Sequence, residues 1–468
     1  MNKKTKIIAT IGPASESVEI LRQLIDKGVN LFRFNLKHNN FEWHKKTINK
    51  AKEVAKALNK KVGIIVDFQG PEIRVETKNG EDLEIKGGES FFIATHFIEE
   101  QKTITVTPPS VIKQIKNNEI IFIDSGELEL RVINKKGNVL EVKTERDGII
   151  KNRKSMNIPS ANLDLPLLAD KDMEALIKIG EMEIDYIALS FVRNKEDIEI
   201  LKKLLLKINP KIKIIAKIEN ASAIKNLEEI VSIADGVMVA RGDLGIEVPI
   251  RELAFWQKKI IDLCRNKNKP VIVATQMLKS MVNSLRPTRA EATDVSNAIF
   301  DGVDALMLSE ETAIGNYPVR VVEEMVNIAI FCENNGNIRE VKIETRNPTE
   351  VLVEAAVRII KDSKNVPIKT VIIFTESGNT ARIFSKYRLN MPILAISDKK
   401  ETVEELALSY GVNPYYKKFQ ENNFKISKKL IEELTGFDFI KSGDNLLLIH
   451  GNNWMESGST SDISLITV

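Results

Sequence analysis

The chain has 468 residues, and single hydrophobic cores stop growing near roughly 250–300 residues, so we expect two or three domains. Hydrophobic residues make up 43% and charged residues 28%, which is ordinary for a soluble globular protein and excludes a disordered class. Lys and Arg (68) nearly balance Asp and Glu (65), with the two signs interspersed, so we expect no nucleic-acid partner.

Membrane and secretory classes are also not indicated by the sequence. No segment approaches the roughly 20 apolar residues of a membrane span, and the apolar run after the basic N-terminus lacks the length of a signal peptide. The two cysteines, Cys264 and Cys332, lie far from any CxxC or Cys/His pattern, which favours reduced thiols. We therefore expect a cytoplasmic protein with no membrane partner.

Short β-branched apolar runs alternate with longer amphipathic segments along the chain. The segment 18–27 is typical of these amphipathic helices, with Ser15 or Ser17 to begin it and Gly28 to end it. Repeated strand–helix units predict a parallel sheet, and eight of them predict a TIM (β/α)8 barrel in an α/β protein. The eight predicted strands are 6–10, 30–35, 62–67, 186–191, 212–219, 236–241, 270–276 and 305–309.

Two segments depart from this rhythm. Residues 72–162 alternate as antiparallel strands do, with hairpin turns predicted at 78–80 and 136–138, so we expect an inserted small β-barrel lid domain. A polar linker is expected at 333–349, followed by a C-terminal α/β domain with strands at 370–374, 392–396 and 446–450. The predicted ranges are 1–70 and 164–340 for the barrel, 71–163 for the lid and 341–468 for the C-terminal domain.

The predicted barrel strands end in polar and charged residues. Active sites of TIM barrels form at the carboxyl ends of the strands, which gives these positions weight. Glu219 and Asp243, on neighbouring strand ends, are a candidate pair for one divalent cation such as Mg²⁺, although two solvated carboxylates remain an alternative. Arg33 and Lys217 supply the positive charge that phosphoryl transfer needs, unless Arg33 only braces the barrel rim.

Short segments along nearly the whole chain resemble those of the pyruvate kinase family. They are KIIATIGPAS from Lys6, FRFN from Phe32, GPEIR from Gly70, AKIEN from Ala216, VARGDLG from Val239, ATQML from Ala274, RPTRAE from Arg286 and ETA from Glu311. The resemblance implies glycolytic transfer of the phosphoryl group of phosphoenolpyruvate to ADP, giving pyruvate and ATP. It also implies a homotetramer.

The resemblance further implies a role for each matching residue. Glu219 and Asp243 would hold Mg²⁺, with Mn²⁺ as a substitute, and the backbone of Ala240, Arg241 and Gly242 would seat the substrate carboxylate. Lys217 would stabilise charge on the transferring phosphoryl group and Arg33 would grip that group. The remaining implied residues are Thr275 beside the protonated carbon, Ser309 and Glu311 in a proton relay, and Asn35, His38, Arg74 and Lys154 near the ADP phosphates, although His38 also fits an ordinary rim histidine.

The third domain contains a loop similar to the effector phosphate site of pyruvate kinases. It follows a strand and opens a helix, so its hydroxyls and backbone N–H groups suit a phosphate, although a plain turn is the alternative. Its residues are Thr375, Ser377, Gly378, Asn379 and Thr380. The stretch 454–460 resembles the effector-loop region only loosely, and the effector, if one exists, is not identified by the sequence.

The chain departs from the family at the expected monovalent-cation site. Potassium-dependent members typically carry Ser where this chain has Lys37, and Thr-Lys where it has Phe68-Gln69; the remaining ligands would be Asn35, Asp67 and the Phe68 carbonyl. We hypothesise that the Lys37 ammonium replaces potassium, so that K⁺ is not required. The alternative is that Lys37 extends into solvent. Further departures are Glu310, Ser125, Ser155 and Ser160, and Glu310 beside Glu311 could raise a carboxyl pKa.

Two other functions compete with this interpretation. A magnesium-dependent phosphoenolpyruvate- or pyruvate-type barrel lyase would also place carboxylates at strand ends, but it would not need the lid segment or GPEIR. A catalytically weakened binding protein is supported only by the departures at Lys37, Gln69 and Glu310.

Overall fold

Eight parallel strands close into a barrel in the computed structural model, which describes residues 3–159, 161, 163–418, 428–451, 458 and 460–468. Each strand pairs with two neighbours around the ring, and β1 joins β2 to β17. All eight predicted strands are confirmed, and so is the TIM-barrel fold. They are β1 (Lys6–Thr10), β2 (Leu31–Asn35), β3 (Gly63–Asp67), β13 (Tyr186–Leu189), β14 (Lys213–Ile218), β15 (Gly236–Ala240), β16 (Val271–Ala274) and β17 (Ala305–Leu308).

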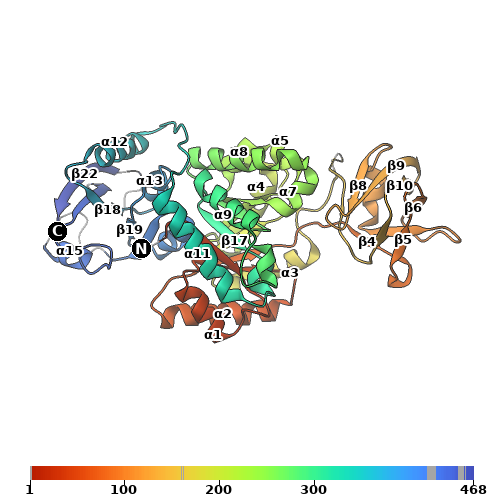
Figure 1. Ribbon diagram of the computed structural model, residues 1–468, viewed down its shortest axis with the longest axis horizontal. Helices are drawn as coiled ribbons and strands as arrows, with labels where there is room; N and C mark the ends of the chain where they lie inside the picture. The colour runs from red at the N-terminus through yellow and green to blue at the C-terminus, as the bar shows by residue number, and fades with distance from the viewer. Residues whose placement is uncertain (1–2, 160, 162, 419–427, 452–457, 459) are drawn as a thin grey trace.

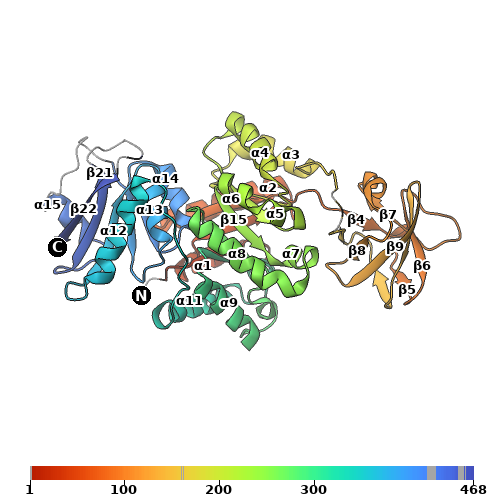
Figure 2. The same cartoon turned by 90° about the horizontal axis from the view of Figure 1, so that it is seen from above.

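Helices surround the barrel (Figures 1 and 2). Helix α1 begins at Ser17, whose side chain accepts the N–H of Ile20, which decides between the two predicted caps. The helices are α1 (Val18–Asp26), α2 (Phe41–Ala57), α3 (Asp170–Lys178), α4 (Lys195–Ile208), α5 (Ala221–Lys225), α6 (Leu227–Ile233), α7 (Arg241–Glu247), α8 (Leu253–Asn266), α9 (Arg289–Asp301), α10 (Glu310–Ala313) and α11 (Pro318–Asn335), with short 3₁₀ turns η3 (Ile179–Glu181), η4 (Ile250–Glu252) and η5 (Lys279–Val282).

The predicted linker begins too early in the sequence. Helix α11 continues to Asn335, and Glu333 within it is buried. Its carboxylate accepts the backbone N–H groups of Lys4 and Thr5 at 2.8 and 2.7 Å. Glu333 therefore belongs to the packed barrel because it satisfies the backbone at the start of β1, a contact that a polar sequence pattern does not reveal.

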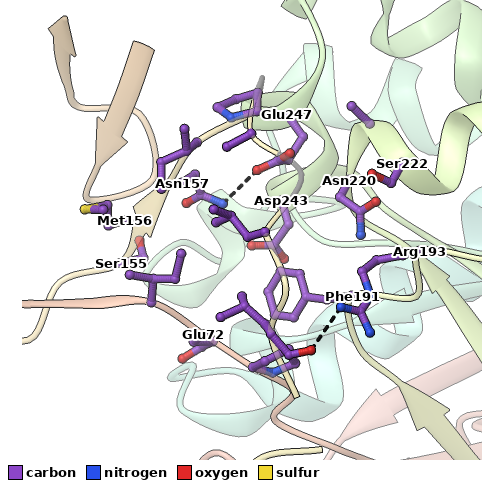
Figure 3. Close-up of a pocket in the computed structure, with 18 residues that line it drawn as sticks. Glu72, Ser155, Met156, Asn157, Phe191, Arg193, Asn220, Ser222, Asp243 and Glu247 are labelled. Carbon is purple, nitrogen blue, oxygen red and sulfur yellow. Dashed lines mark hydrogen bonds between the residues drawn. The ribbon is translucent and has the colours of Figure 1, made fainter. Parts of the chain in front are cut away.

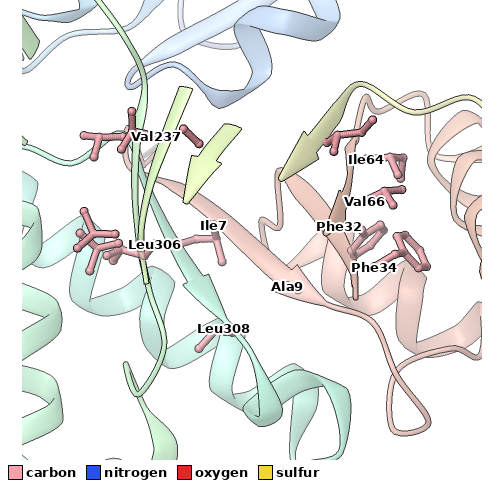
Figure 4. Close-up of a cluster of buried hydrophobic side chains, with 14 of the residues drawn as sticks. Ile7, Ala9, Phe32, Phe34, Ile64, Val66, Val237, Leu306 and Leu308 are labelled. Carbon is pink, nitrogen blue, oxygen red and sulfur yellow. The ribbon is translucent and has the colours of Figure 1, made fainter. Parts of the chain in front are cut away.

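Alternation along each strand separates two hydrophobic layers. Side chains such as Ile8, Leu31 and Ile215 fill the barrel interior, whereas their neighbours in sequence pack outward against the helices. Figure 4 shows the outward layer on β1, β2 and β3. Because successive side chains of a strand point to opposite faces, this register also decides which residues at the strand ends point into the barrel mouth.

The inserted domain forms a separate β structure at one end of the molecule (Figure 1). Seven of its strands make one sheet in the order β12-β8-β9-β10-β6-β7-β4, and β5 pairs with β11. The strands are β4 (Arg74–Glu76), β5 (Leu83–Ile85), β6 (Ser90–Ala94), β7 (Thr103–Thr107), β8 (Ile120–Ile123), β9 (Leu128–Lys136), β10 (Val139–Lys143), β11 (Gly148–Ile150) and β12 (Met156–Asn157), with 3₁₀ turns η1 (Lys78–Gly80) and η2 (Pro109–Gln114).

One of the two predicted hairpins in this domain is wrong. The turn at 136–138 does join the antiparallel pair β9 and β10. Residues 78–80 instead form η1, and the strands on either side do not pair with each other, because β4 pairs with β7 and β5 pairs with β11. The turn residues were identified correctly, but strand partners depend on contacts distant in sequence.

The C-terminal sheet has five strands in the order β20-β19-β18-β21-β22. The three predicted strands are confirmed, while β20 and the antiparallel edge strand β22 were not predicted. The elements are α12 (Pro348–Asp362), β18 (Ile368–Phe374), α13 (Asn379–Ser385), β19 (Ile393–Ser397), α14 (Lys400–Glu405), η6 (Leu406–Leu408), β20 (Val412–Tyr416), α15 (Lys428–Leu434), β21 (Asn445–Gly451) and β22 (Thr460–Thr467). The four predicted domain ranges stay a prediction.

Two features bear on the expected surroundings of the protein. Among the helices in the described part of the chain, none combines the length and apolar character needed to cross a membrane. Cys264 and Cys332 are both buried and unpaired with each other.

Candidate active site

Charged side chains occupy inward positions at the carboxyl ends of β2, β3 and β14. Arg33, Asp67 and Lys217 each lie two residues beyond an interior hydrophobic residue, namely Leu31, Ile65 and Ile215. The two-residue period of a strand therefore points them into the mouth of the barrel, above the apolar filling. All three side chains are buried.

Asp67 lies between two cations. Its Oδ2 atom is 2.7 Å from Arg33 Nε, and its Oδ1 atom is 3.2 Å from Lys217 Nζ. Lys217 Nζ also lies 2.9 Å from Glu219 Oε1 and donates to Ser190 Oγ at 2.7 Å. Ser190 was not among the predicted site residues. Its place just after β13, at the next inward position beyond Ala188, was the available signal.

Burial and ion pairing shift the pKa values of this cluster in opposite directions. For Lys217, burial disfavours the ammonium, but the carboxylates of Asp67 and Glu219 outweigh burial and raise its pKa. For Asp67, burial raises the pKa, but Lys217 and Arg33 together bring it below the ordinary value. Lys217 and Asp67 are therefore both charged at neutral pH, and Lys217 is a permanent cation at the barrel mouth.

Glu219 and Asp243 form the predicted carboxylate pair. Burial, against the opposing charge of Lys217 and together with the negative charge of Asp243, raises the pKa of Glu219 to about 7. Burial also raises the pKa of Asp243. Glu219 Oε2 accepts the N–H of Phe191 at 2.8 Å, and Phe191 has a φ of 55°, a conformation uncommon for a bulky side chain. The two carboxylates interact electrostatically and lie near enough to repel.

This pair fits a hard cation that keeps most of its coordination for other oxygens. Among the described residues, no group of three or more His, Cys, Asp or Glu side chains is arranged to hold a metal. Mg²⁺ typically uses one or two carboxylates and completes an octahedron with water and substrate oxygens. A buried carboxylate, Glu219, and a half-buried one, Asp243, that repel each other are the donor set that such an ion would stabilise.

Thr275 and the start of α7 lie together across the same mouth. Gly242 N–H donates to Thr275 Oγ1 at 2.8 Å, and Arg241 Nη2 donates to the Thr275 carbonyl at 2.8 Å. Thr275 has a φ of 70°, which is strained for a β-branched residue and is typical of functional positions. The structure therefore brings together the predicted residues Arg241, Gly242 and Thr275. Arg241 also pairs with Asp294, a contact that the sequence analysis missed.

Ser309 and Glu311 interact, but Glu310 faces away from them. Glu311 is buried, and its carboxylate accepts the N–H of Ser309 at 2.7 Å and that of Leu278 at 3.2 Å. The Ser309 hydroxyl is buried without a hydrogen-bond partner in the described part of the chain. Glu310 is exposed and pairs with Lys279, so the two adjacent carboxylates have different surroundings.

Glu72 joins one residue of the predicted cation site, Lys37, to one of the predicted nucleotide site, Arg74. Lys37 Nζ lies 2.7 Å from Glu72 Oε1, and Arg74 pairs with the other carboxylate oxygen of Glu72. Lys37 N–H donates to Asn35 Oδ1 at 3.1 Å. The Lys37 ammonium thus pairs with a carboxylate of the GPEIR segment, while the Phe68 carbonyl accepts from Ser190 Oγ. Glu72 was quoted within the motif but given no role.

The other nucleotide candidates lie on the lid and the rim. Lys154 Nζ pairs with Asp124 at 2.9 Å within the lid, and its carbonyl accepts the N–H of Val75, beside Arg74. Burial lowers the pKa of His38, and the charges of Lys37 and Arg33 lower it further, so His38 is neutral at pH 7. Ser125 N–H lies 3.3 Å from Ser155 Oγ, and Ser160 is outside the described residues.

A cavity of about 120 Å³ opens between the barrel mouth and the segments that connect the lid. Asp243 and Glu247 line it from the barrel side, and Glu72, Ser155, Met156 and Asn157 line it from the lid and its connecting segments (Figure 3). One member of the carboxylate pair, Asp243, therefore faces a space that a moving lid could enclose.

Comparisons with known proteins agree with this architecture. Residues 2–322 match the family model described as pyruvate kinase, barrel domain, and residues 350–466 match pyruvate kinase, alpha/beta domain. A pyruvate kinase from Bacillus licheniformis is 38% identical over 472 residues, covering 100% of this chain and 80% of that protein. One from Staphylococcus epidermidis is 37% identical, covering 98% and 79%. The crystal structure of a pyruvate kinase from Cryptosporidium parvum has a TM-score of 0.91 at 34% identity and covers 99% of this chain and 96% of that one.

Fold and site together define a TIM-barrel phosphotransferase with an inserted lid domain. The chain belongs to the pyruvate kinase family, as both family models and the full-length relatives indicate. It transfers the phosphoryl group of phosphoenolpyruvate to ADP and yields pyruvate and ATP. The lyase alternative is not favoured.

Proposed function

We propose that Lys217, Arg33 and the carboxylate pair of Glu219 and Asp243 carry out the transfer at the barrel mouth. The observation that supports this most is the buried Lys217 ammonium, which lies 2.9 Å from Glu219 and is kept charged by Asp67 and Glu219. A transferring phosphoryl group gains most from fixed positive charge in a site sheltered from water. Lys217 stabilises the charge on that group and on the enolate that is left, while Arg33, oriented by Asp67, binds the phosphoryl oxygens.

Mg²⁺, or Mn²⁺ in its place, is the proposed cofactor of Glu219 and Asp243. Held by these two carboxylates, the ion would neutralise negative charge on the substrate. The backbone of Ala240, Arg241 and Gly242 seats the substrate carboxylate, and Thr275 is positioned beside it by the bond from Gly242. Ser309 and Glu311 hold the proton relay that converts the enolate to pyruvate.

Asn35, His38, Arg74 and Lys154 are the proposed residues for ADP. Arg74 and Lys154 lie on adjacent segments at the base of the lid, whereas Asn35 and His38 lie on the barrel rim. Phosphates held between these two groups would draw the lid toward the barrel. Closure excludes water, so the phosphoryl group passes to ADP and is not hydrolysed.

Following pyruvate formation from phosphoenolpyruvate with and without ADP tests this function. Turnover that requires ADP and a divalent cation supports the assignment. Turnover without ADP would indicate a lyase, and no turnover under either condition would indicate a binding protein.

Lys37 is the proposed substitute for the monovalent cation. Its ammonium is held by Glu72 at 2.7 Å, and its charge acts on Asp243 in the direction that favours the ionised carboxylate. A cation fixed to the chain would then supply the charge that other members obtain from bound potassium. The enzyme would therefore work without K⁺.

The loop before α13 is the proposed phosphate site of an effector. Gly378, with a φ of 75°, allows the turn, its N–H donates to Thr375 Oγ1 at 3.0 Å, and Thr380 Oγ1 lies 2.9 Å from Thr460 Oγ1. Ser377 and Asn379 complete the loop. Most of the 454–460 segment lies outside the described residues. A homotetramer and a cytoplasmic location are further proposals drawn from the family.

A further inference from the structure

Glu247, the last residue of α7, connects three parts of the molecule. Its Oε1 atom accepts a hydrogen bond from Asn157 Nδ2 at 3.1 Å (Figure 3). The backbone N–H of Ala221, the first residue of α5, also faces the Glu247 carboxylate and favours its ionised form, which lowers the pKa of Glu247 against the effect of burial. One side chain therefore contacts the returning strand of the lid, the segment that follows β14 and the helix that follows β15.

The two barrel segments that meet at Glu247 are those that carry the metal carboxylates. Asp243 lies four residues before Glu247 in α7, so the two side chains share a face of the helix, one turn apart. Glu219 lies two residues before Ala221, separated from it by Asn220, which caps α5 through Ala223 N–H at 2.8 Å. Glu247 and Ala221 line the same cavity, so the approach of the Glu247 carboxylate to Ala221 N–H links the segments that hold Glu219 and Asp243.

The third contact reaches the lid. Asn157 belongs to β12, which pairs with β8 in the lid sheet, with Asn157 opposite Phe122. The lid and α7 also come close to each other at Gly126, between β8 and β9. A Cβ atom added there would lie 4.0 Å from the Ile246 side chain. Helix α7 is thus the surface of the barrel on which this end of the lid rests.

We propose that Glu247 is a positioning residue that couples the lid to the metal carboxylates. This inference rests on the proposed metal and nucleotide sites. Partners of this kind, which orient ligands without touching the metal, commonly affect metal affinity about 10- to 100-fold. Burial raises the pKa of Glu247 to about 7, which marks the carboxyl as held in place for its contacts at a cost in solvation.

Four variants separate the two connections: Glu247→Ala, Glu247→Gln, Asn157→Ala and, as a control, Glu228→Ala, which removes an exposed glutamate of α6. Mn²⁺ binding to the substrate-free protein is measured by electron paramagnetic resonance of free Mn²⁺. The steady-state kcat and the KM for each substrate are measured alongside, with thermal unfolding as a check on folding.

Glu247→Ala is expected to weaken Mn²⁺ binding about tenfold and to raise the KM for ADP. Glu247→Gln keeps one acceptor oxygen, so its Mn²⁺ binding should weaken less and its KM for ADP should rise less than in Glu247→Ala. Asn157→Ala is expected to raise the KM for ADP several-fold while Mn²⁺ affinity stays near that of wild type, because only the lid contact is lost. Glu228→Ala should match wild type in every measurement.

Wild-type Mn²⁺ affinity and KM values in both Glu247→Gln and Asn157→Ala would overturn the inference, even if Glu247→Ala failed to fold. Two further variants separate this from failure of the metal site itself. If Glu219→Gln and Asp243→Asn abolish Mn²⁺ binding while the Glu247 variants leave it unchanged, only the role of Glu247 is wrong. If Glu219→Gln and Asp243→Asn also bind Mn²⁺ as wild type does, the proposed metal site is wrong and the inference falls with it.

Discussion

The barrel contains buried charge at both ends, but the two ends are built differently. At the mouth, Lys217 pairs with both Asp67 and Glu219, and Asp243 beside them lines a cavity. At the opposite end, Asp304 accepts Tyr410 N–H at 2.9 Å and Val271 N–H at 3.0 Å and pairs with Arg388 at 2.7 Å. The carboxylate there is satisfied by backbone groups and one cation from the C-terminal domain.

This difference shows how a buried charge that serves the chemistry can be told from one that serves stability. At the closed end the partners are supplied by the chain itself, which joins the barrel to the C-terminal domain. At the mouth the chain leaves Glu219 and Asp243 with raised pKa values, which is a cost unless a cation arrives. In TIM barrels, residues at the amino-terminal ends of the strands serve mainly stability, and residues at the carboxyl ends carry out the chemistry.

The largest effect is expected for Lys217→Met. Removal of the ammonium that lies 2.9 Å from Glu219 and faces the proposed phosphoryl position should lower kcat about 10³-fold, as for loss of one major transition-state donor. The thermal midpoint should change little, because Asp67 keeps the cation of Arg33 at 2.7 Å and Glu219, with its pKa raised to about 7, can take up a proton, so no buried charge is left without a partner. Initial rates of pyruvate formation measure kcat, and calorimetry measures the thermal midpoint. Lys207→Met, an exposed change on α4, is the control; activity of Lys217→Met equal to it would remove Lys217 from catalysis.

At the closed end, Arg388→Met should reduce stability instead of catalysis. Asp304 would keep a buried charge without its cation, which typically costs about 3–5 kcal/mol. Urea denaturation followed by fluorescence measures the loss, and kcat per folded molecule should stay near wild type. Arg358→Met breaks an exposed pair with Glu354 and should unfold as wild type does. Equal stability of the two variants would contradict the structural role of Asp304.

Lys37→Ser should create a dependence on potassium. Wild-type activity is expected to be similar in K⁺ and in tetramethylammonium, because the Lys37 ammonium is part of the chain. The variant should lose about tenfold in kcat in tetramethylammonium, or about 1.4 kcal/mol, and recover part of it in K⁺. Strong activation of the wild-type enzyme by K⁺ would rule out the substitution.

The smallest effect is expected for the way in which the stability contributed by Lys6, at the closed end of the barrel, depends on pH. Burial lowers the pKa of Lys6 to about 8 against the opposing charges of Glu333 and Asp304, from 10.5 in the unfolded chain. Between these values the unfolded state binds more protons, so the contribution of Lys6 to stability rises from pH 8 to 10.5 and is lost as pH falls through 8. The free energy of unfolding of Lys6→Met relative to that of wild type should therefore fall as pH rises. A constant difference across urea titrations at pH 7.5 and 9.5 would contradict the shift.

Much of the candidate site follows from strand positions in the sequence. Arg33, Asp67, Lys217 and Glu219 lie at or just beyond the ends of predicted strands, and the barrel places such ends together. Ser190 and Glu72 were not assigned, although both lie within segments that were identified. Their roles depend on contacts of 2.7 Å to Lys217 and Lys37, and such pairings arise between residues far apart in the chain.

The sequence by itself determined the barrel, because the two-residue period of strands and the 3.6-residue period of helices are local properties. It also determined which residue types gather at the strand ends. Only the tertiary structure decided the partners: that Lys37 pairs with Glu72, that the strands around 78–80 pair elsewhere, and that Glu333 satisfies the start of β1. Partner choice depends on side-chain reach and on the balance of burial against pairing, and both are set only when distant segments meet.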